Sequence, residues 1–581
     1  MEPTGYVRDE SASKHAVSLI YARKSSSVKS LFPTIPLLPS DAFCTEGSNM
    51  MGRRVAGSLF ATAIASQLNR EEELLIWSYN KQSQHQLQQL LEGKIADGAI
   101  ARLIETISLK DITDVGAIHL PGPGIASWTW IRERTDARAF SFTGIIHTLC
   151  SREAMRSLQD LVLAPVYEWD AVVCTSTAGK EAVLNAIEIR LEAAERRFGL
   201  KVSNKRMPQF PIIPLAGTTE QPYSPDLDRR ARRKQARQDL SIDRDAFVVA
   251  FVGRLCHYSK GHPLPLYRAL GHIASSGKNV ILLECGYFYN EEMAAAYEDL
   301  KSFFPGVDFK VYGGDKPADE ATKWQVLAAA DVFTSPADNL QETFGLTLLE
   351  AMAAELPIVA SNWSGYRDLV KNEVNGYLIP VKDTIIENET GPDWIDLEGA
   401  QGNINYTNMI GLRSLGVALD TSSYTSALMQ LCVNPEMAEE MGKRGNKMLR
   451  SKFSEQAVIK EYRELYKELA SHRASSLQKE KCFEGIPSLD APHSQVFQHY
   501  ASNTDCHHSK GITLTRMPTT TVSHPINKPL LDQLFGPYRE EIISKLGNNE
   551  LITAGELMKI GIDKDRARQI VSALSKIGLT T

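Results

Sequence analysis

The chain has 581 residues, more than one hydrophobic core can organise, and at roughly 100–200 residues per domain this length predicts several domains. Apolar residues make up 43% and charged residues 23%, so collagenous, low-complexity and wholly disordered proteins are excluded and a globular protein is expected. The 64 basic and 70 acidic residues leave a net charge of −6, so a dedicated nucleic-acid-binding protein is not expected.

No stretch approaches the roughly 18 consecutive apolar residues of a membrane span, and the first residues lack the pattern of a secretory signal. A cytoplasmic location is expected, with peripheral contact to the inner face of a membrane as the alternative. The 8 cysteines contain no C-x-x-C pair, so neither a disulfide framework nor a zinc ribbon is predicted. Cys506, His507 and His508 lie in a polar stretch with irregular spacing and are interpreted as incidental, so no metal site is predicted.

Short apolar runs rich in β-branched residues recur between about residues 73 and 380, and each is followed by a turn and a stretch of helical periodicity. This alternation is typical of parallel βαβ units. The expected strands are Leu74–Tyr79, Val115–Leu120, Ala139–Ile146, Ala171–Thr175, Pro211–Leu215, Phe247–Val252, Val280–Leu283, Phe309–Tyr312, Val332–Thr334 and Ile358–Ser361.

These runs are more than one doubly wound sheet holds comfortably, and Gly217, Pro222 and Pro225 cluster where the series can be divided. We therefore expect an α/β chain with one Rossmann-like domain over residues 1–215 and a second over 216–470. The second domain is expected to close with a helical stretch that ends near Leu469. Residues 471–528 lose all periodicity and are predicted to be a disordered linker, and helical spacing returns in a small module over 529–581.

Two basic segments invite a nucleic-acid interpretation. Arg229–Arg237 has helical length and precedes the first strand of the second domain, which favours a solvated helix face over a nuclear-localisation or nucleic-acid signal. The tail loosely resembles a helix-turn-helix with Lys564, Arg566 and Arg568 on its second helix, but a small packing or protein-contact module is the preferred interpretation.

The segment from Ser335 to Ala353 places two carboxylates, Glu342 and Glu350, across a predicted strand-to-helix turn. If the helix begins near Thr343, then the backbone amides of Phe344, Gly345 and Leu346 are unpaired donors at its positive end. Because Gly345 lets a ligand approach the backbone, a phosphate or a sugar hydroxyl is expected to bind there.

A second constellation follows the strand that ends at Val252. Gly253 and Gly261 frame a segment in which Arg254 is followed six residues later by Lys260. Two cations at the carboxyl end of a strand suit a diphosphate, because each stabilises negative charge on phosphate oxygens.

Together these motifs resemble the group 1 retaining glycosyltransferases, a family of the GT-B fold with a Glu-x7-Glu motif and an Arg/Lys pair. The likeness is close over Phe251–Gly261 and Asp331–Pro380, and weaker over Met51–Gly57, His119–Gly124, Thr143–Thr148 and Val172–Val183. It covers roughly residues 40–470 and implies two Rossmann-like domains that face a cleft. Residues beyond 475 lie outside it.

The resemblance also implies roles. Arg254 and Lys260 would hold the leaving diphosphate with the backbone at Gly253, and Glu350 would bind the donor ribose. Glu342 would bind the donor sugar with the backbone of Phe344, Gly345 and Leu346, while His147 of the first, acceptor domain would lie beside the reacting carbon. Gly52 would lie near the donor phosphates. The expected substrates are a nucleotide-diphosphate sugar and a glycan, lipid-linked or small-molecule acceptor, with no metal and no separate cofactor.

Several residues keep a structural alternative. His147 and His119 each follow an apolar run and could be satisfied core histidines, and Gly52 could simply begin a turn into the helix Arg53–Leu68. The apolar side of that helix could dock on a membrane, although packing against the first sheet is preferred.

Two other functions remain open on the residues alone. A sugar-nucleotide epimerase would use the same diphosphate site without an acceptor groove, and a catalytically idle binding protein would keep the fold without the chemistry. Glu355 and Glu284 depart from the small residues usual in the family at their positions, which puts the sugar specificity in doubt.

Overall fold

The computed structural model describes residues 17–21, 30–45, 52–133, 136–202, 206–383, 394–476, 522, 525, 527–547 and 552–576. The chain divides into two compact units, one over Ala16–Leu489 and one that joins Met1–His15 to Asp490–Thr581. Most of the linker predicted over 471–528 lies outside the described residues.

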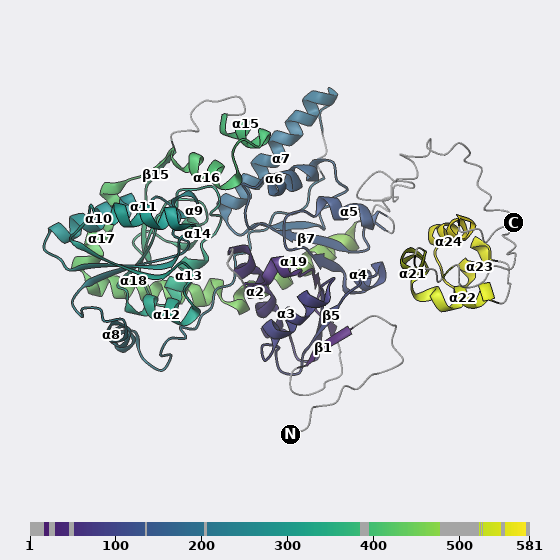
Figure 1. Cartoon of the computed structure of the whole chain (residues 1–581), viewed down its shortest axis with the longest axis horizontal. Helices are drawn as coiled ribbons and strands as arrows, with labels where there is room; N and C mark the ends of the chain where they lie inside the picture. The colour runs from purple at the N-terminus through teal and green to yellow at the C-terminus, as the bar shows by residue number, and fades with distance from the viewer. Residues whose placement is uncertain are drawn as a thin grey trace, which may run out of the picture. The chain divides into compact units, whose positions relative to one another are not determined.

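The large unit contains two α/β domains (Figure 1). The first domain holds one sheet in the order β1-β5-β4-β2 and another in the order β3-β6-β7-β8, and a backbone hydrogen bond of 2.9 Å from Leu38 to Trp77 links them. All of these strand pairs are parallel except β1 with β5. The strands are β1 Val17–Tyr21, β2 Ser30–Leu31, β3 Ile35–Pro36, β4 Glu72–Trp77, β5 Ile100–Ile104, β6 Ala117–His119, β7 Ser141–Ile145 and β8 Ala171–Val173.

Helices cover both faces of these sheets. Helices α2, α3 and α19 supply side chains to one core, and helices α4 to α7 supply the core on the other side. The helices of this part are α1 Ser40–Phe43, α2 Gly52–Ser66, α3 Lys81–Leu91, α4 Leu109–Val115, α5 Ala126–Arg132, α6 Arg152–Gln159 and α7 Thr177–Phe198, with a short 3-10 turn over Asp160–Val162.

The second domain is a single parallel sheet in the order β11-β10-β9-β12-β13-β14. Helices α10, α11 and α17 cover one face, and α8, α12 and α13 cover the other (Figure 1). The strands are β9 Phe247–Val252, β10 Val280–Tyr287, β11 Val307–Gly314, β12 Val332–Ser335, β13 Ile358–Ser361 and β14 Gly376–Ile379. The helices are α8 Arg229–Asp239, α9 His257–Lys260, α10 Leu264–Ser275, α11 Glu291–Lys301, α12 Glu320–Ala329, α13 Leu346–Ala353, α14 Tyr366–Leu369, α17 Thr421–Val433 and α18 Pro435–Met448.

The expected pair of Rossmann-like domains is therefore confirmed. β9 and β13 have the predicted ends, and the strand predicted over Pro211–Leu215 is the main exception. That segment makes a single isolated bridge beside β8, at Ile212, and another lies just before it at Gln209, because the prolines there lack the backbone N–H that a ladder needs.

An insertion over residues 381–419 separates β14 from α17. It consists of the antiparallel pair β15 Val381–Asp383 and β16 Val417–Leu419, with α15 Trp394–Gln401 and α16 Tyr406–Ser414 between them. No helix or strand is predicted for it from sequence periodicity. A side chain at Gly411 of α16 would collide with the ring of Tyr258 at 2.3 Å, so α16 packs closely on α9.

Helix α19, Glu455–Ser475, follows a π-helical turn at Leu449–Phe453 and packs on the first domain. Its residues Tyr462, Leu465 and Leu469 are at most 4% exposed within the core of the first sheet. The expectation that this stretch closes the second domain is therefore corrected, because its apolar stripe faces the other sheet. The domain limits at 215 and 470 stay predictions, and α19 runs beyond the second of them.

The basic run Arg229–Arg237 forms α8, but it is not simply a solvated face. Arg229 donates to the carbonyl oxygens of Ala328 and Ala330 at 2.7 and 2.5 Å, and Arg237 donates to that of Ala329 at 2.9 Å. Arg237 is only 2% exposed and is paired with Asp331 at 2.7 Å. These arginines satisfy the carbonyls at the end of α12, so their role is structural.

The small unit has its own hydrophobic core, which includes Phe535, Ile542, Leu557 and Ile570. Its helices are α21 Lys528–Phe535, α22 Arg539–Gly547, α23 Ala554–Lys559 and α24 Lys564–Lys576, with a 3-10 turn over Gly536–Tyr538. Arg566 donates to the backbone oxygen of Leu534 at 2.7 Å, so part of the basic surface of α24 is used within the module. Among the described residues, none of the helices combines the length and apolar composition that crossing a bilayer requires.

Candidate active site

A cleft of ≈ 880 Å³ lies between the two domains of the large unit. The first domain contributes the start of α6 and α7, and the second contributes the loop after β12 and the segment around Trp363. The insertion forms a third wall with Tyr406, Met409 and Ile410. At one point this wall touches the first domain directly, because the Cys150 sulfur lies 3.1 Å from the Tyr406 hydroxyl.

Glu342 stands in the loop between β12 and α13 and lines this cleft. Its Oε2 accepts a hydrogen bond from Lys260 Nζ at 2.8 Å, and its Oε1 accepts a longer one from the backbone of Phe344 at 3.4 Å. Burial acts to raise the pKa of Glu342, but the Lys260 ammonium outweighs it and holds the pKa below its usual range. Glu342 is therefore an anion next to a cation at neutral pH.

Helix α13 begins at Leu346, three residues later than the sequence predicts. Gly345 precedes it with φ 112°, a left-handed conformation that favours glycine, and a side chain there would collide with the Tyr366 ring at 2.6 Å. The delay has a structural reason, because Thr343 is engaged with the first domain. The Thr343 carbonyl accepts from the Ser176 hydroxyl at 2.7 Å, and its own hydroxyl donates to the backbone oxygen of His147.

Arg254 and Lys260 both follow the carboxyl end of β9. Lys260 is the last residue of α9, and its side chain is paired with Glu342. Arg254 is partly exposed, lies 5.8 Å from the ring centre of Tyr287, and has no ion-pair partner among the residues that the structure describes. Gly253 and Gly261 have φ of 151° and 107°, and a side chain at Gly261 would collide with the carbonyl oxygen of Pro336 at 2.2 Å. The glycines therefore let these strand ends approach each other closely.

Glu350 lies on α13 and is paired with a lysine that sequence reasoning missed. Lys323 of α12 donates to Glu350 Oε1 at 2.6 Å and to Glu320 at 2.8 Å. Burial raises the pKa of Glu350, and the Lys323 charge only partly offsets this rise. For Lys323, burial lowers the pKa, but the two carboxylates outweigh it and raise the pKa overall. Lys323 lies 27 positions from Glu350, so no local motif connects them.

His147 follows β7 and is half-buried, whereas His119 at the end of β6 is only 2% exposed. Burial, and then the charge of Arg53, lower the pKa of His147 to about 4. Burial, and then His147, lower the pKa of His119 to about 3. Both imidazoles are therefore neutral at pH 7, and the Nδ1 of His119 lies 2.9 Å from the Thr143 hydroxyl.

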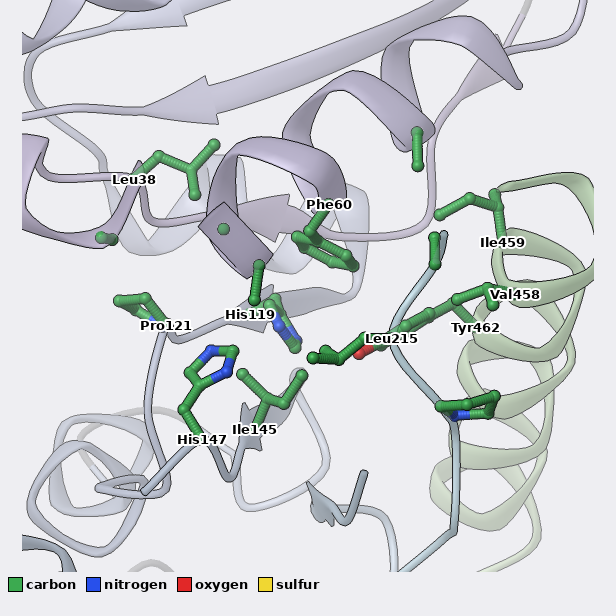
Figure 2. Close-up of a pocket in the computed structure, with 16 residues that line it drawn as sticks. Leu38, Phe60, His119, Pro121, Ile145, His147, Leu215, Val458, Ile459 and Tyr462 are labelled. Carbon is green, nitrogen blue, oxygen red and sulfur yellow. The ribbon is translucent and has the colours of Figure 1, made fainter. Parts of the chain in front are cut away.

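Figure 2 shows both rings on the wall of a small enclosed cavity, with Phe60 of α2 and Tyr462 of α19 beside them. The ring centres of Phe60 and His119 are 4.8 Å apart, and Ile64 of α2 is 1% exposed. The C-terminal half of the apolar side of α2 therefore packs in the core, whereas Val55, Leu59 and Phe60 are partly exposed.

Gly52 is the first residue of α2, and a side chain added there would meet nothing within 4 Å. The glycine of this segment that the structure requires is Gly57, where a side chain would collide with the backbone oxygen of Ala42 at 2.0 Å. Gly52 nevertheless lies next in sequence to Arg53, whose charge reaches His147. Its assignment to the donor site stays a prediction.

The structure thus brings His147, Glu342 and Lys260 to one region, since the Thr343 hydroxyl bonds the His147 carbonyl and Lys260 bonds Glu342. Arg254 follows β9 at the same edge of the sheet. Glu350 lies on α13, eight positions after Glu342. A metal centre finds no support in the described ranges, where no group of three or more His, Cys, Asp or Glu side chains converges. Fixed cations can stabilise the negative charge of a diphosphate that leaves a sugar, and a buried carboxylate can stabilise positive charge that develops on the sugar ring.

Comparison with known proteins shows a family that part of the second domain matches. The family described as "Glycosyl transferases group 1" matches residues 232–387, which include Arg254, Lys260, Glu342 and Glu350. A D-inositol 3-phosphate glycosyltransferase of Corynebacterium kroppenstedtii is 30% identical over 177 residues, which are 30% of this chain and 37% of the relative. The UDP-Gal:alpha-D-GlcNAc-diphosphoundecaprenol alpha-1,3-galactosyltransferase of Escherichia coli is 25% identical over 272 residues, 44% of this chain and 62% of the relative. The chain thus spans less than two thirds of each relative.

Among solved structures, Alr3699/HepE of Anabaena in complex with UDP covers 76% of this chain and 100% of its own, with 16% identity and a TM-score of 0.46. The sucrose-phosphate synthase of Thermosynechococcus elongatus also covers 76% of this chain, with 17% identity and a TM-score of 0.45. Likenesses of this size add nothing to the fold described above.

Proposed function

We propose that the chain is a retaining glycosyltransferase of the GT-B fold, because its residues 232–387 match the family of group 1 glycosyltransferases. It moves a sugar from a nucleotide-diphosphate sugar to a glycan, lipid-linked or small-molecule acceptor, and it needs no metal ion. The observation that carries this proposal is the 2.8 Å pair of Lys260 with Glu342, set at the carboxyl edge of the second sheet against the His147 segment.

The chemistry follows from where charge develops. The bond between the anomeric carbon of the sugar and the diphosphate oxygen breaks, and its electron pair stays on the phosphate. The oxygen of an acceptor hydroxyl forms the new bond to that carbon from the same face, and its proton passes to the departing phosphate oxygen. Arg254 and Lys260 stabilise that charge, and one such donor in a closed site is worth about 3–4 kcal/mol of barrier. Since these side chains neutralise the leaving group, the proposed reaction has no step that requires a divalent cation.

The remaining residues orient the donor. Glu350 accepts hydrogen bonds from the ribose hydroxyls, and the backbone of Phe344, Gly345 and Leu346 holds the sugar together with Glu342. A neutral His147 contributes a hydrogen bond beside the reacting carbon without adding charge. The acceptor enters the ≈ 880 Å³ cleft, whose insertion wall supplies apolar side chains and the Tyr406 ring.

The proposal is tested by following release of nucleoside diphosphate from a panel of nucleotide sugars, with and without candidate acceptors, in the presence of EDTA. Release that depends on an acceptor and is unaffected by EDTA is the expected result. Release without any acceptor would favour hydrolysis, and conversion of the sugar nucleotide without release would indicate an epimerase. Activity that vanishes with EDTA and returns with Mg²⁺ or Mn²⁺ would contradict the metal-independent mechanism.

A further inference from the structure

Asp338 is a buried carboxylate that the reaction proposed above leaves without a role. It stands in the loop after β12 and is 9% exposed. Its Oδ2 accepts a hydrogen bond from the backbone N–H of His262 at 3.2 Å. Its Oδ1 is buried and, within the described part of the chain, has no hydrogen-bond partner, and no cation is paired with this carboxylate there.

Leaving such an atom unpaired is costly. A buried polar group without a partner loses about 1–3 kcal/mol, and a charged group loses more. The cost is visible in the acid strength of the group, because burial raises the pKa of Asp338 to about 7 despite the opposing backbone hydrogen bond from His262. A group that keeps this disadvantage in the folded protein is a candidate for a ligand contact.

The position of Asp338 indicates what that ligand is. Asp338 lines the same cleft as Glu342, which lies four positions later in the loop. The Oδ2 of Asp338 accepts a hydrogen bond from the backbone of His262, in the turn that follows Lys260. The donor residues Arg254, Lys260 and Glu350 do not line this cleft. Asp338 therefore shares a cleft with Glu342, the residue proposed to bind the sugar, and not with the residues proposed to bind the diphosphate and the ribose.

The loop that carries Asp338 is fixed from several directions. The Ser361 hydroxyl donates to the carbonyl of Ala337 at 2.5 Å, and the Trp363 indole donates to that of Asn339 at 2.8 Å. The left-handed turn at Gly261 allows the close approach at Pro336 described above. The unpaired oxygen is thus held in place in the absence of substrate, which is the arrangement that limits the entropy cost of binding.

We propose that Asp338 accepts a hydrogen bond from a hydroxyl group of the transferred sugar and is a specificity-determining residue for that sugar. In its ionised form the carboxylate only accepts, so its partner must carry a donor, and the hydroxyls are the donors that a hexose presents along its ring. The inference rests on the proposed function, because it needs a nucleotide sugar in the cleft. An acceptor sugar presents the same chemistry and is the alternative source that the experiment separates.

The test measures affinity by calorimetry for two pairs of probes, UDP with UDP-glucose and GDP with GDP-mannose. For a pair that binds the wild-type protein, Asp338→Asn is expected to weaken the nucleotide sugar at least about tenfold, as loss of a charged hydrogen bond does, and to leave the nucleoside diphosphate within about twofold. Asp396→Asn is the matched control, since this carboxylate lines the same cleft from the insertion and is half exposed, and both affinities should stay unchanged.

Deoxy analogues of the same nucleotide sugar identify the hydroxyl. The analogue that lacks the bound hydroxyl should bind the wild-type protein about tenfold more weakly, yet bind the Asp338→Asn protein as well as the parent compound does. The thermal midpoint of Asp338→Asn, and of Asp338→Ala as a second variant, should not fall below that of the wild type. A residue with only a structural role would lose stability instead.

Each other outcome is decisive. If Asp338→Asn weakens the nucleoside diphosphate as much as the nucleotide sugar, or weakens neither, then the assignment is wrong. If the affinity for the nucleotide sugar is unchanged while the KM of an acceptor rises about tenfold, then the hydroxyl belongs to the acceptor. Failure of the wild-type protein to bind any probe would count against the proposed function itself, and is distinguishable from a failure of the variant.

Discussion

Two clusters of ionisable residues, one in each domain, differ in their electrostatics. The second domain carries a charged cluster of Arg254, Lys260, Glu342 and Glu350, in which each carboxylate is paired with a lysine and of which only Glu342 lines the cleft. The first domain carries an imidazole cluster of His119 and His147, which line the small cavity of Figure 2 and are both neutral because burial lowers their pKa. In the proposed reaction the charged cluster stabilises the charge that develops, and His147 supplies an uncharged hydrogen bond.

The largest effect should come from removing α19, the helix that follows the second domain and packs on the first. A protein truncated at Ser454 loses α19, whose apolar face is buried in the first domain, and each such side chain contributes about 1.5–3 kcal/mol. We expect it to be insoluble or unfolded. A protein truncated at Ser475 keeps α19 and should stay folded and bind the donor, which circular dichroism and calorimetry can check.

A folded and soluble Ser454 truncation would mean that α19 is dispensable for the first domain. A Ser475 truncation that folds but binds no nucleotide sugar would mean that the C-terminal residues contribute to donor binding.

The two cations of the charged cluster are tested by the substitutions Lys260→Ala and Arg254→Ala. Each removes a cation aimed at the leaving diphosphate, so turnover should fall about a hundredfold or more, which corresponds to about 3 kcal/mol of transition-state stabilisation. Steady-state kinetics measure the loss, and circular dichroism confirms that the fold is retained. Near-normal rates in both variants would show that Lys260 and Arg254 do not stabilise the diphosphate.

Substitution of the two carboxylates of the charged cluster should have different effects on kcat and KM. Glu350→Gln weakens a single acceptor of hydrogen bonds from the ribose, so the donor KM should rise about tenfold with a smaller change in kcat. Glu342→Ala removes the partner of Lys260 beside the sugar, so kcat should fall as well. The opposite ranking in kcat and KM would show that these two roles are exchanged.

The smallest expected effect is on the pH dependence of stability, through the imidazole cluster. A histidine whose folded pKa lies far below its ordinary value near 6.5 binds a proton only when the protein unfolds. Unfolding therefore takes up protons between pH 6.5 and about 4, and stability falls as the pH is lowered through this window. For the 2% exposed His119, the slope approaches about 1 kcal/mol per pH unit.

His119→Gln should flatten this dependence of the thermal midpoint between pH 7 and 5, whereas His272→Gln, which alters an exposed histidine of α10, should not. An equal pH dependence in the His119→Gln and wild-type proteins would show that this imidazole is protonated in the folded state.

Local patterns predicted the second domain well and the contacts between elements poorly. The buried strands β9 and β13 have the predicted ends because a parallel strand is apolar on both faces and stands out in the sequence. Helical periodicity in α19 predicts a buried stripe but not which sheet it faces. Lys323 was missed because its partner Glu350 is brought to it by the fold, not by spacing.

The start of α13 and the insertion were missed for a related reason. The sequence placed the helix start near Thr343, but Thr343 is held by Ser176 and His147 of the first domain, so the helix begins only after Gly345. The insertion between β15 and β16 has short helices whose apolar residues line a cleft, so no continuous core pattern marks it.

Proton NMR of the product tests the proposed transfer with retention of configuration. With a nucleotide sugar and an acceptor that release diphosphate together, one glycoside should form for each nucleoside diphosphate released. The coupling constant of its anomeric proton should report the same configuration as the donor. A glycoside of inverted configuration, or diphosphate released without a glycoside, would show that the protein is not a retaining glycosyltransferase.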